Sequence, residues 1–378
     1  MDRMKSATNQ QANILQHLQV LVACDSQNPP RAINKDSEIF NYLQQNLSGF
    51  EFEFIDAGDG CLCLLATRGS PSLLFNFHID TVPIAPGWQS DPFALQVETD
   101  KVTGLGACDI KGAAACMLSA VSRTTGDVAL LFSSDEEFGS SAAVRAFLAT
   151  SHGFRKVIVA EPTQVKAVIA HRGIQSATFT IKGVSGHASE ARAMTDSAIH
   201  RAARWSSAAL DWVAGLDETF DNLRGMPFNI GKISGGIKAN MIAADCELKI
   251  GFRPLPGQDP LKILNQLVDV DQQDGHKKNT QIEVQHTFNG PSLPAANQSL
   301  DQTLTHAKEF ARRLELPLGE AVNFWTEASL FSLAGLTAIV FGPGNIAQAH
   351  TANEWVSIDQ LLKVEQLYCN ILSDSQNF

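Results

Sequence analysis

An α/β domain interrupted by a smaller ferredoxin-like α+β domain is the fold class that the sequence predicts, and three observations predict it. Short, continuously apolar strands such as Leu73–Phe77 and Val128–Phe132 alternate with segments of helical spacing. This alternation is typical of a mostly parallel sheet covered by helices. In the middle of the chain the order becomes strand, helix, strand, strand, helix, strand, which is that of a ferredoxin-like unit. The α/β pattern then resumes, so the second domain is expected to be inserted into the first.

The first domain is predicted to cover residues 1–174 and 288–378. It begins with an amphipathic helix at 8–23, because Ile14, Leu18 and Leu21 fall at helical spacing. Strands and small-residue helices follow. The predicted strands are Leu73–Phe77, Val128–Phe132, Val157–Ala160 and Ala338–Phe341, and the predicted helices are Lys111–Arg123, Ser141–Thr150 and Ser299–Leu314.

The inserted domain is predicted to cover residues 175–287. Its strands are expected at Ser176–Gly183, Pro227–Ser234, Ile242–Phe252 and Thr280–Phe288, and its helices at Met194–Leu216 and Pro260–Val270. Apolar residues at alternate positions from Cys246 to Phe252 are typical of a strand with one buried face. The polar segment Asp269–Lys278 is expected to be a solvated loop.

The composition is that of a folded globular protein without a strongly basic surface. The 378 residues include 29 lysines and arginines against 40 aspartates and glutamates, which gives a net charge of −11. This balance argues against broad binding to nucleic acid or to anionic membranes, since both depend on lysine and arginine. The seven cysteines contain no Cys-x-x-Cys motif and are expected to be buried free thiols. With no signal-peptide pattern and no apolar run near the ~20 residues of a membrane span, a cytoplasmic location is expected.

Histidine and carboxylate side chains follow the predicted strands where the strands end. His78 and Asp80 lie two residues apart and therefore share a face of the extended chain. A carboxylate beside an imidazole can fix its tautomer and leave the other nitrogen for a metal. On its own, His-x-Asp is a weak signal, and a histidine that is only hydrogen-bonded at a strand end is the simpler interpretation.

Five further residues occupy comparable positions. Asp109 stands at the start of a predicted helix after glycines, where a helix N-cap is the simpler interpretation. Glu136 and Glu137 belong to a run of three carboxylates whose repulsion is costly unless a cation offsets it, although a solvated acidic turn is the alternative. Glu161 follows the next strand as an ordinary turn would, and His350 follows a glycine loop as a surface histidine would. No P-loop or dinucleotide-binding glycine motif is present.

Together these residues point to a metal site at one edge of the sheet, because ligands of open α/β sheets bind at the carboxyl ends of the strands. Oxygen and imidazole ligands without thiolates suit zinc or a similar divalent ion. Three carboxylates and two histidines are too many for one tetrahedral zinc. They fit two ions that share a bridging carboxylate.

These motifs, in this order and over nearly the whole chain, resemble the M20 family of metallopeptidases and amidohydrolases. The resemblance implies a zinc-exopeptidase-like α/β catalytic domain with the inserted ferredoxin-like domain as a lid. It also implies two zinc ions, with cobalt as a substitute. His78 and Glu161 would bind one ion, Glu137 and His350 the other, and Asp109 would bridge them.

The resemblance further implies the roles of residues that bind no metal. Asp80 would orient the histidine of the first zinc, and Glu136 would be the general base that takes a proton from water and returns it to the leaving amine. His187, in Gly186-His187-Ala188 of the lid, would cross a dimer interface and stabilise the oxyanion. Asn240 and Arg253 would hold the carboxylate of the substrate.

Two positions depart from the family pattern. Gly104-Leu105-Gly106 stands where many members have Gly-Arg-Gly, and Thr326-Glu327-Ala328 where many have Thr-Asp-Ala or Thr-Asp-Gly. Neither position supplies a metal ligand. Glu327, one methylene longer than aspartate, is expected to reshape the pocket or to meet a polar end of the substrate, with a purely structural role equally open.

The sequence therefore predicts a homodimeric, dizinc amidohydrolase that removes the acyl group of an N-acyl amino acid. N-acetylornithine or N-acetylcitrulline, in arginine biosynthesis, is the expected substrate. A succinyl-diaminopimelate desuccinylase or a dipeptidase is the alternative within the class. A noncatalytic metabolite-binding relative is the alternative of another class, against which the intact Glu136 argues.

Overall fold

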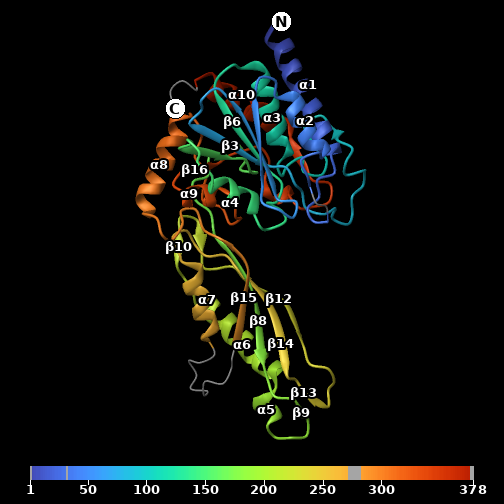
Figure 1. Ribbon diagram of the computed structural model, residues 1–378, viewed down its shortest axis with the longest axis vertical. Helices are drawn as coiled ribbons and strands as arrows, with labels where there is room; N and C mark the ends of the chain where they lie inside the picture. Colours follow the sequence, from blue (N-terminus) through green and yellow to red (C-terminus); the bar gives the residue numbers. More distant parts are fainter. Residues whose placement is uncertain (1, 31–32, 271–281, 375–378) are drawn as a thin grey trace. The chain divides into compact units, whose positions relative to one another are not determined.

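The computed structural model describes residues 2–30, 33–270 and 282–374, and these form two compact units (Figure 1). Unit 1 comprises the described residues up to Ile169, Asp301–Gly319, and those from Thr326 onward. Unit 2 comprises the described part of Ala170–Leu300 together with Glu320–Trp325. One unit is thus inserted into the other. No helix of the described residues is long and apolar enough to cross a membrane.

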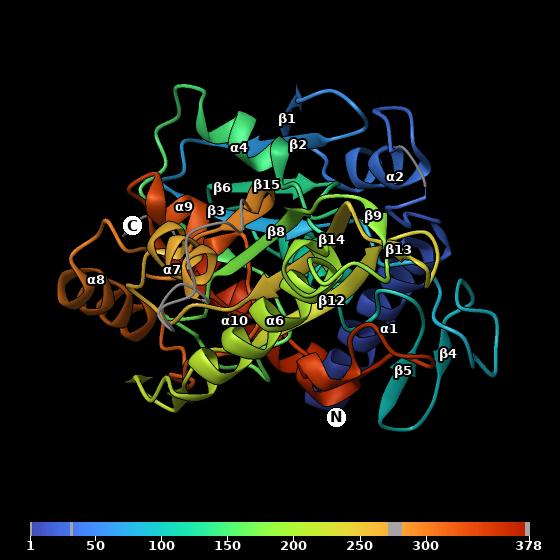
Figure 2. The ribbon, with the colours of Figure 1, turned by 90° about the horizontal axis from the view of Figure 1, so that it is seen from below.

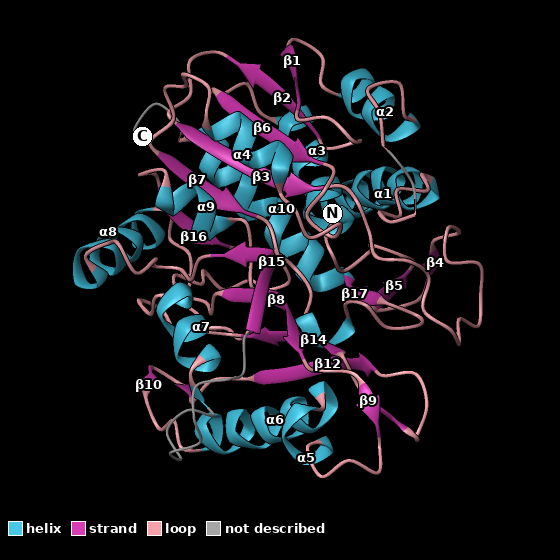
Figure 3. Ribbon diagram, turned by 60° about the horizontal axis from the view of Figure 1, so that its bottom comes forward, coloured by secondary structure: helices cyan, strands magenta, loops and turns pink. Residues whose placement is uncertain are grey.

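Unit 1 is built on a six-stranded sheet with the order β1-β2-β6-β3-β7-β16, and Figure 3 shows these strands side by side. Strands β6, β3, β7 and β16 are parallel, whereas β1 and β2 are antiparallel to their neighbours. The sheet is therefore mixed, and its parallel part contains the strands that the sequence predicted. The bounds are β1 (Glu51–Asp56), β2 (Leu62–Arg68), β3 (Leu73–His78), β6 (Val128–Ser133), β7 (Lys156–Val159) and β16 (Thr337–Val340).

Helices cover both faces of this sheet. Helices α1, α3 and α10 pack against one another, and Tyr368 of α10 contacts the rings of Phe75 and Phe77 on β3. Helices α4 and α9 pack on the sheet through β1, β2, β7 and β16. The helices of unit 1 are α1 (Asp2–Ala23), α2 (Glu38–Asn46), α3 (Lys111–Arg123), α4 (Ala142–Leu148), α8 (Leu300–Arg313), α9 (Ala328–Leu333) and α10 (Ile358–Ser373), with a short 3-10 helix, η2 (Ile346–Gln348).

The continuous apolar runs of the sequence become the central strands, because both of their faces are covered. Every side chain of β3 and of β6 is buried. The run Ala113–Ala115 at the start of α3 is also buried, and its small side chains allow close packing of the helices. All seven cysteines are buried and free, as predicted. A smaller sheet completes unit 1, with strands β4 (Gln96–Val97), β5 (Lys101–Thr103) and β17 (Trp355–Ser357).

Unit 2 has the predicted ferredoxin-like order of elements. Its antiparallel sheet has the order β12-β14-β8-β15, and Figure 2 shows α6 and α7 in front of it. The indole of Trp205 on α6 is fully buried and donates a hydrogen bond to the carbonyl of Leu267 on α7, which joins the two helices. The main elements are β8 (Ile174–Lys182), α6 (Ala198–Ala214), β12 (Phe228–Gly235), β14 (Asp245–Phe252), α7 (Pro260–Val268) and β15 (Ile282–Gly290).

Two predicted elements of unit 2 are divided. The helix expected at Met194–Leu216 is split into α5 (Ala193–Asp196) and α6, because Ser197 has extended backbone angles and caps α6 through the N–H of His200. The strand expected at Ile242–Phe252 is split into β13 (Met241–Ile242), which pairs with β9 (Gly186–His187), and β14. Two further short strands are β10 (Thr219–Phe220) and β11 (Leu223–Arg224). The expected loop at Asp269–Lys278 and the expected strand start at Thr280 fall mostly outside the described residues.

Unit 2 extends beyond the expected 175–287 at both ends. Strand β15 stays paired with β8 as far as Gly290, and His171 and Leu293 exchange two backbone hydrogen bonds. The segment Glu320–Trp325 also joins this unit, because the indole of Trp325 packs edge-on against Phe288 and donates to the carbonyl of Pro291. Interstrand pairing, rather than the apolar pattern, therefore sets these bounds.

Candidate metal centre

Three neighbouring parallel strands of unit 1 place three of the candidate ligands. His78 is the last residue of β3, Glu137 follows β6, and Glu161 follows β7. Because β6, β3 and β7 are adjacent and parallel, their carboxyl ends lie at the same edge of the sheet (Figure 3). Asp109 lies in the loop before α3, and His350 follows η2.

The five predicted ligands meet at this edge. The Nε2 atom of His78 lies 3.1 Å from Oδ1 of Asp109, and Nε2 of His350 lies 3.5 Å from Oδ2 of the same carboxylate. His350 Nε2 is also 2.8 Å from Oε1 of Glu137. Three residues form each of two groups, and within each group the ligand atoms all lie within 4.8 Å of one another. Asp109 belongs to both groups. The groups are His78, Asp109, Glu161 and Asp109, Glu137, His350.

The charges at this edge are those of a cation site. Desolvation and the charge of Asp109 raise the pKa of Glu161 well above its usual range, and desolvation also raises the pKa of Glu137. Hydrogen bonds to Asp109 and Glu137 raise the pKa of His350 to about 11. Clustered acids thus favour positive charge on the nearby imidazoles. Imidazole and carboxylate donors without thiolates fit two divalent ions that share Asp109.

Asp80 holds two of the ligand segments. The Nδ1 atom of His78 lies 3.1 Å from the backbone oxygen of Asp80 and 3.6 Å from its carboxylate Oδ1. The other carboxylate oxygen, Oδ2, accepts a hydrogen bond of 2.9 Å from the backbone N–H of Glu137. The backbone of Asp80 therefore makes the closer contact with the imidazole, and its carboxylate positions the segment of Glu137.

The three consecutive acids after β6 have different surroundings. Asp135 is buried, and its Oδ2 accepts hydrogen bonds from Ser140 Oγ and from the N–H groups of Ala142 and Ala143 at the start of α4. Glu137 belongs to a ligand group, whereas Glu136 belongs to neither. Desolvation and the charge of Glu137 raise the pKa of Glu136 well above its usual range. A raised pKa beside a metal centre suits a group that accepts and returns a proton.

Glu327 is buried on the α9 side of the sheet, with 1% of its surface exposed. Its Oε2 accepts a hydrogen bond of 2.9 Å from Ser133 Oγ, whereas Oε1 has no hydrogen-bond partner among the described residues. Desolvation and the charge of Asp135 raise the pKa of Glu327 to about 7.

The other three predicted site residues belong to unit 2. His187 and Asn240 are close together, because β9 pairs with β13 and the N–H of Ala188 donates to the carbonyl of Asn240. Arg253 follows the far end of β14, and its carbonyl accepts a hydrogen bond from the buried Arg172. Asn240 precedes β13, and Arg253 follows the other end of β14, so this eight-residue strand lies between them along the chain. The structure therefore places the two residues predicted for one carboxylate beyond opposite ends of β14.

Glu354 is a site residue to which the sequence pattern assigned no role. Its side chain is buried and accepts hydrogen bonds from the backbone N–H groups of Gly106, Cys108 and Asp109. Its position four residues after His350 was the only signal available from the sequence.

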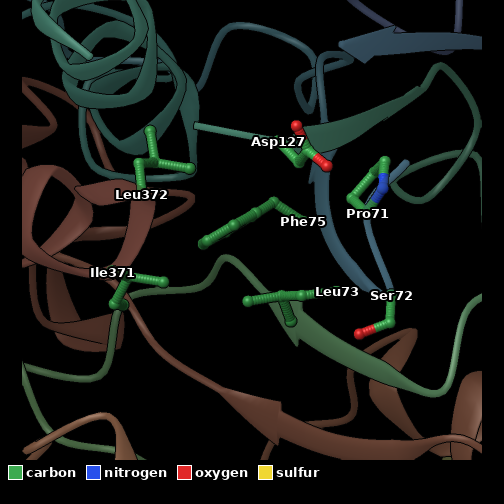
Figure 4. A pocket seen from close by; sticks show the side chains of 7 residues that line it. All are labelled: Pro71, Ser72, Leu73, Phe75, Asp127, Ile371 and Leu372. Carbon is green, nitrogen blue, oxygen red and sulfur yellow. The ribbon is translucent and has the colours of Figure 1, made fainter. Parts of the chain in front are cut away.

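A pocket lies at the end of β3 that is opposite to His78 (Figure 4). Apolar side chains of Leu73, Phe75, Ile371 and Leu372 line it. The single carboxylate there, that of Asp127, accepts a hydrogen bond from the N–H of Ser70. This pocket therefore lacks the converging polar groups of the metal centre.

Comparisons with known proteins find similar sequences over most of the chain. The model of peptidase family M20/M25/M40 matches residues 74–374. An N-acetyl-L-citrulline deacetylase of Xanthomonas campestris pv. campestris is 47% identical over 366 residues, covering 96% of this chain and 98% of the relative. An acetylornithine deacetylase of Myxococcus xanthus is 31% identical over 353 residues, covering 86% and 89% of the two chains.

Solved structures share the fold at low sequence identity. Aminopeptidase PepT from Bacillus cereus superposes with a TM-score of 0.72 at 18% identity, over 97% of this chain and 99% of the other. The metallo-carboxypeptidase Sso-CP2 from Sulfolobus solfataricus superposes with a TM-score of 0.69 at 18% identity, again over 97% and 99% of the chains.

Replacing Glu327 by Gln should make the metal-free protein relatively more stable as the pH rises. Between its usual pKa of 4.5 and the folded value of about 7, the folded chain holds one more proton than the unfolded chain, so wild-type stability falls through this window. The difference between these two pKa values corresponds to at most roughly 3–4 kcal/mol. The difference in unfolding free energy between Glu327→Gln and wild type, from urea titrations at pH 5 to 8, should increase with pH.

Glu53→Gln provides the matched control, because it makes the same chemical change at an exposed side chain. If the Glu327→Gln difference stays constant across these pH values, Glu327 does not carry a raised pKa in the folded protein.

Proposed function

Because the chain belongs to peptidase family M20/M25/M40, we propose that it is a dizinc amidohydrolase that deacetylates an Nα-acetyl amino acid. The proposed substrate is N-acetyl-L-citrulline, with N-acetylornithine as the second candidate. The observation that carries this choice is the 47% identity with an N-acetyl-L-citrulline deacetylase over almost the full length of both chains. The acetylornithine deacetylases at 31–33% identity support the second candidate.

Five residues of unit 1 would hold the two ions. His78 and Glu161 would bind one ion, Glu137 and His350 the other, and Asp109 would bind both. The two ligand groups that share Asp109, and the raised pKa values of the acids in them, support this assignment. Zinc suits such donors, and cobalt would substitute for it.

Glu136 would be the general base and general acid of the reaction. When bound, a pair of divalent ions supplies a water of lowered pKa and polarises the amide carbonyl. The Glu136 carboxylate would take a proton as water adds to the carbonyl carbon, and would return it to the amide nitrogen as the C–N bond breaks. Its place next to Glu137, outside both ligand groups, and its raised pKa support this role.

Residues of unit 2 would bind the remaining parts of the substrate. Arg253 would bind the α-carboxylate, since a guanidinium matches that group with two parallel hydrogen bonds. His187 would donate to the oxyanion, and its exposed imidazole is held by Ser189 Oγ at 2.7 Å from Nδ1. Glu327 would meet the polar end of the substrate. The separation of Asn240 and His187 from Arg253 along β14 supports their supply by two different chains.

A homodimer formed through unit 2 would provide the second chain. Strand β12 is an edge strand of the sheet, and its side chains are mostly exposed. Unit 2 also carries large apolar side chains that are at least 39% exposed, among them Ile233 on β12 itself and Val184, Ile199, Ile237 and Met241 on other segments. An open edge flanked by apolar surface favours pairing with a second copy.

The seven free thiols fit a reducing cytoplasm. The reaction itself would belong to arginine biosynthesis.

Replacement of Glu136 by Gln should separate proton transfer from metal binding. Turnover should fall by about 10²–10⁴-fold, because the general base is lost. About two ions per chain should remain bound, as in bridged two-metal sites. Inductively coupled plasma mass spectrometry measures the number of bound ions per chain, and steady-state kinetics measure turnover. A chelator should abolish wild-type turnover, and added zinc should restore it. Unchanged turnover in Glu136→Gln would eliminate the mechanism.

A substrate panel should distinguish the candidate reactions. With zinc-loaded protein, kcat/KM should be highest for N-acetyl-L-citrulline, followed by N-acetylornithine, and lowest for succinyl-diaminopimelate and simple dipeptides. Release of the free amine is the measured signal. Preference for a dipeptide would contradict the deacetylase assignment, and zinc binding without turnover of any amide would favour a noncatalytic binding protein.

Mixing two inactive variants should restore activity if His187 acts across the dimer. In a mixed dimer of His187→Ala and Glu136→Gln chains, one site has an intact Glu136 and receives an intact His187. Random pairing through a two-fold interface should return about a quarter of wild-type activity after subunit exchange. Recovery indistinguishable from either variant alone would show that His187 does not act in a neighbouring subunit.

A further inference from the structure

We propose that Glu354 is a positioning residue that fixes the bridging ligand Asp109 between the two metal sites. Its carboxylate accepts three backbone hydrogen bonds from the loop that carries Asp109. Oε1 accepts from the N–H of Cys108 at 2.8 Å and from the N–H of Asp109 at 2.9 Å, and Oε2 accepts from the N–H of Gly106 at 3.0 Å. The proposal rests on the dizinc function proposed above.

The backbone of Glu354 also holds the start of this loop. Its carbonyl accepts a hydrogen bond of 3.0 Å from the N–H of Gly104. Strand β17 follows immediately and pairs with β5, so the backbone of Glu354 is anchored to a sheet. Four backbone N–H groups between positions 104 and 109 therefore donate hydrogen bonds to Glu354.

The loop that carries Asp109 packs closely against its neighbours and is hydrogen-bonded to α3. Gly106 has a φ of +76°, and a Cβ atom there would lie 2.7 Å from Cγ2 of Thr81. The N–H of Lys111 donates to the carbonyl of Gly106 at 2.8 Å, which ties the loop to the first turn of α3. Any movement of the Asp109 backbone must therefore break contacts with Glu354 or with α3.

The position of Glu354 links this loop to a second ligand. Glu354 lies four residues after His350, and Nε2 of His350 is 3.5 Å from Oδ2 of Asp109. The intervening segment is itself held, because Asn353 Oδ1 accepts a hydrogen bond from the N–H of Gln89. One side chain thus sets the distance between the bridging carboxylate and the imidazole beside it.

The chemistry of the contact requires a carboxylate of this length. Both oxygens of a carboxylate accept hydrogen bonds, whereas a glutamine amide has one oxygen and one NH2 group. In Glu354→Gln, the NH2 group would face at least one backbone N–H, which would lose its acceptor in a buried place. In Glu354→Asp, both oxygens remain, but the side chain is one methylene shorter and cannot reach all three donors.

Glu365 offers a matched control for the loss of a buried carboxylate. It is fully buried on α10 and accepts hydrogen bonds from Ser119 Oγ at 3.1 Å and from Arg123 Nη1 at 2.6 Å. None of the hydrogen bonds to it comes from the Gly104–Asp109 loop. Glu365→Gln should therefore lower the melting temperature without changing metal affinity.

The test is a zinc titration of metal-free protein against a competing chromophoric chelator. Zinc affinity should fall about 10–100-fold in Glu354→Gln, the range for residues that orient metal ligands, and stay at the wild-type value in Glu365→Gln. Glu354→Asp should fall in between and remains informative if Glu354→Gln does not fold. In zinc-saturated Glu354→Asp, kcat should fall while KM for the acetylated substrate stays near wild type, because substrate contacts are unaltered.

Wild-type zinc affinity in a folded Glu354→Asp or Glu354→Gln would overturn the proposal. An equal loss of affinity in Glu365→Gln would also overturn it, because the effect would then be one of general stability. Failure of the wild-type chain to bind zinc would instead refute the proposed dizinc function, so the two failures are distinguishable.

Discussion

The concentration of negative charge at one edge of the unit 1 sheet is the constraint on which the rest of this structure depends. Glu137 and Glu161 each belong to a ligand group that contains Asp109, and Glu136 is the residue before Glu137. Desolvation makes this arrangement costly, as the raised pKa values of the three glutamates indicate. Such a cluster persists only where a rigid framework imposes it and positive charge compensates it.

The sheet supplies that framework. β3 and β6 are buried throughout, and their carboxyl ends cannot shift without disturbing the packing of Phe75 and Phe77 against Tyr368. Ligands at strand ends are thus held by the apolar core behind them. Asp109 and His350 come from loops instead and depend on hydrogen bonds for the same precision. This difference explains why Glu354, a residue that binds no metal, would matter to metal affinity.

Unit 2 has a different relation between fold and function. Its core, around Trp205, stabilises a sheet whose β12 edge remains exposed. The exposed His187 and the adjacent Asn240 lie beyond one end of β14, and Arg253 follows the other end. The proposed second copy of the chain would let one substrate site use residues from both ends of β14. In this way the geometry of one unit connects the proposed chemistry with the proposed dimer.

The sequence by itself determined the central strands of unit 1 and pointed to the imidazoles and carboxylates near their ends. The apolar runs marked β3, β6, β7 and β16, and His78, Glu137 and Glu161, at or shortly after the ends of three of them, belong to the two ligand groups that share Asp109. These signals are local, since they rest on side-chain periodicity and on the position of an acid or imidazole at the end of an element. Local signals overlooked the break at Ser197, where a single residue with extended angles divides two helices.

Only the tertiary structure decided how the polar atoms pair. The oxygens of Glu354 accept hydrogen bonds from residues about 245 positions earlier in the chain. Glu327 proved to be buried against Ser133, and the backbone of Asp80 proved to contact His78 more closely than its carboxylate does. A buried donor bonds to whatever acceptor folding brings within 3 Å of it, and a sequence pattern does not contain that distance.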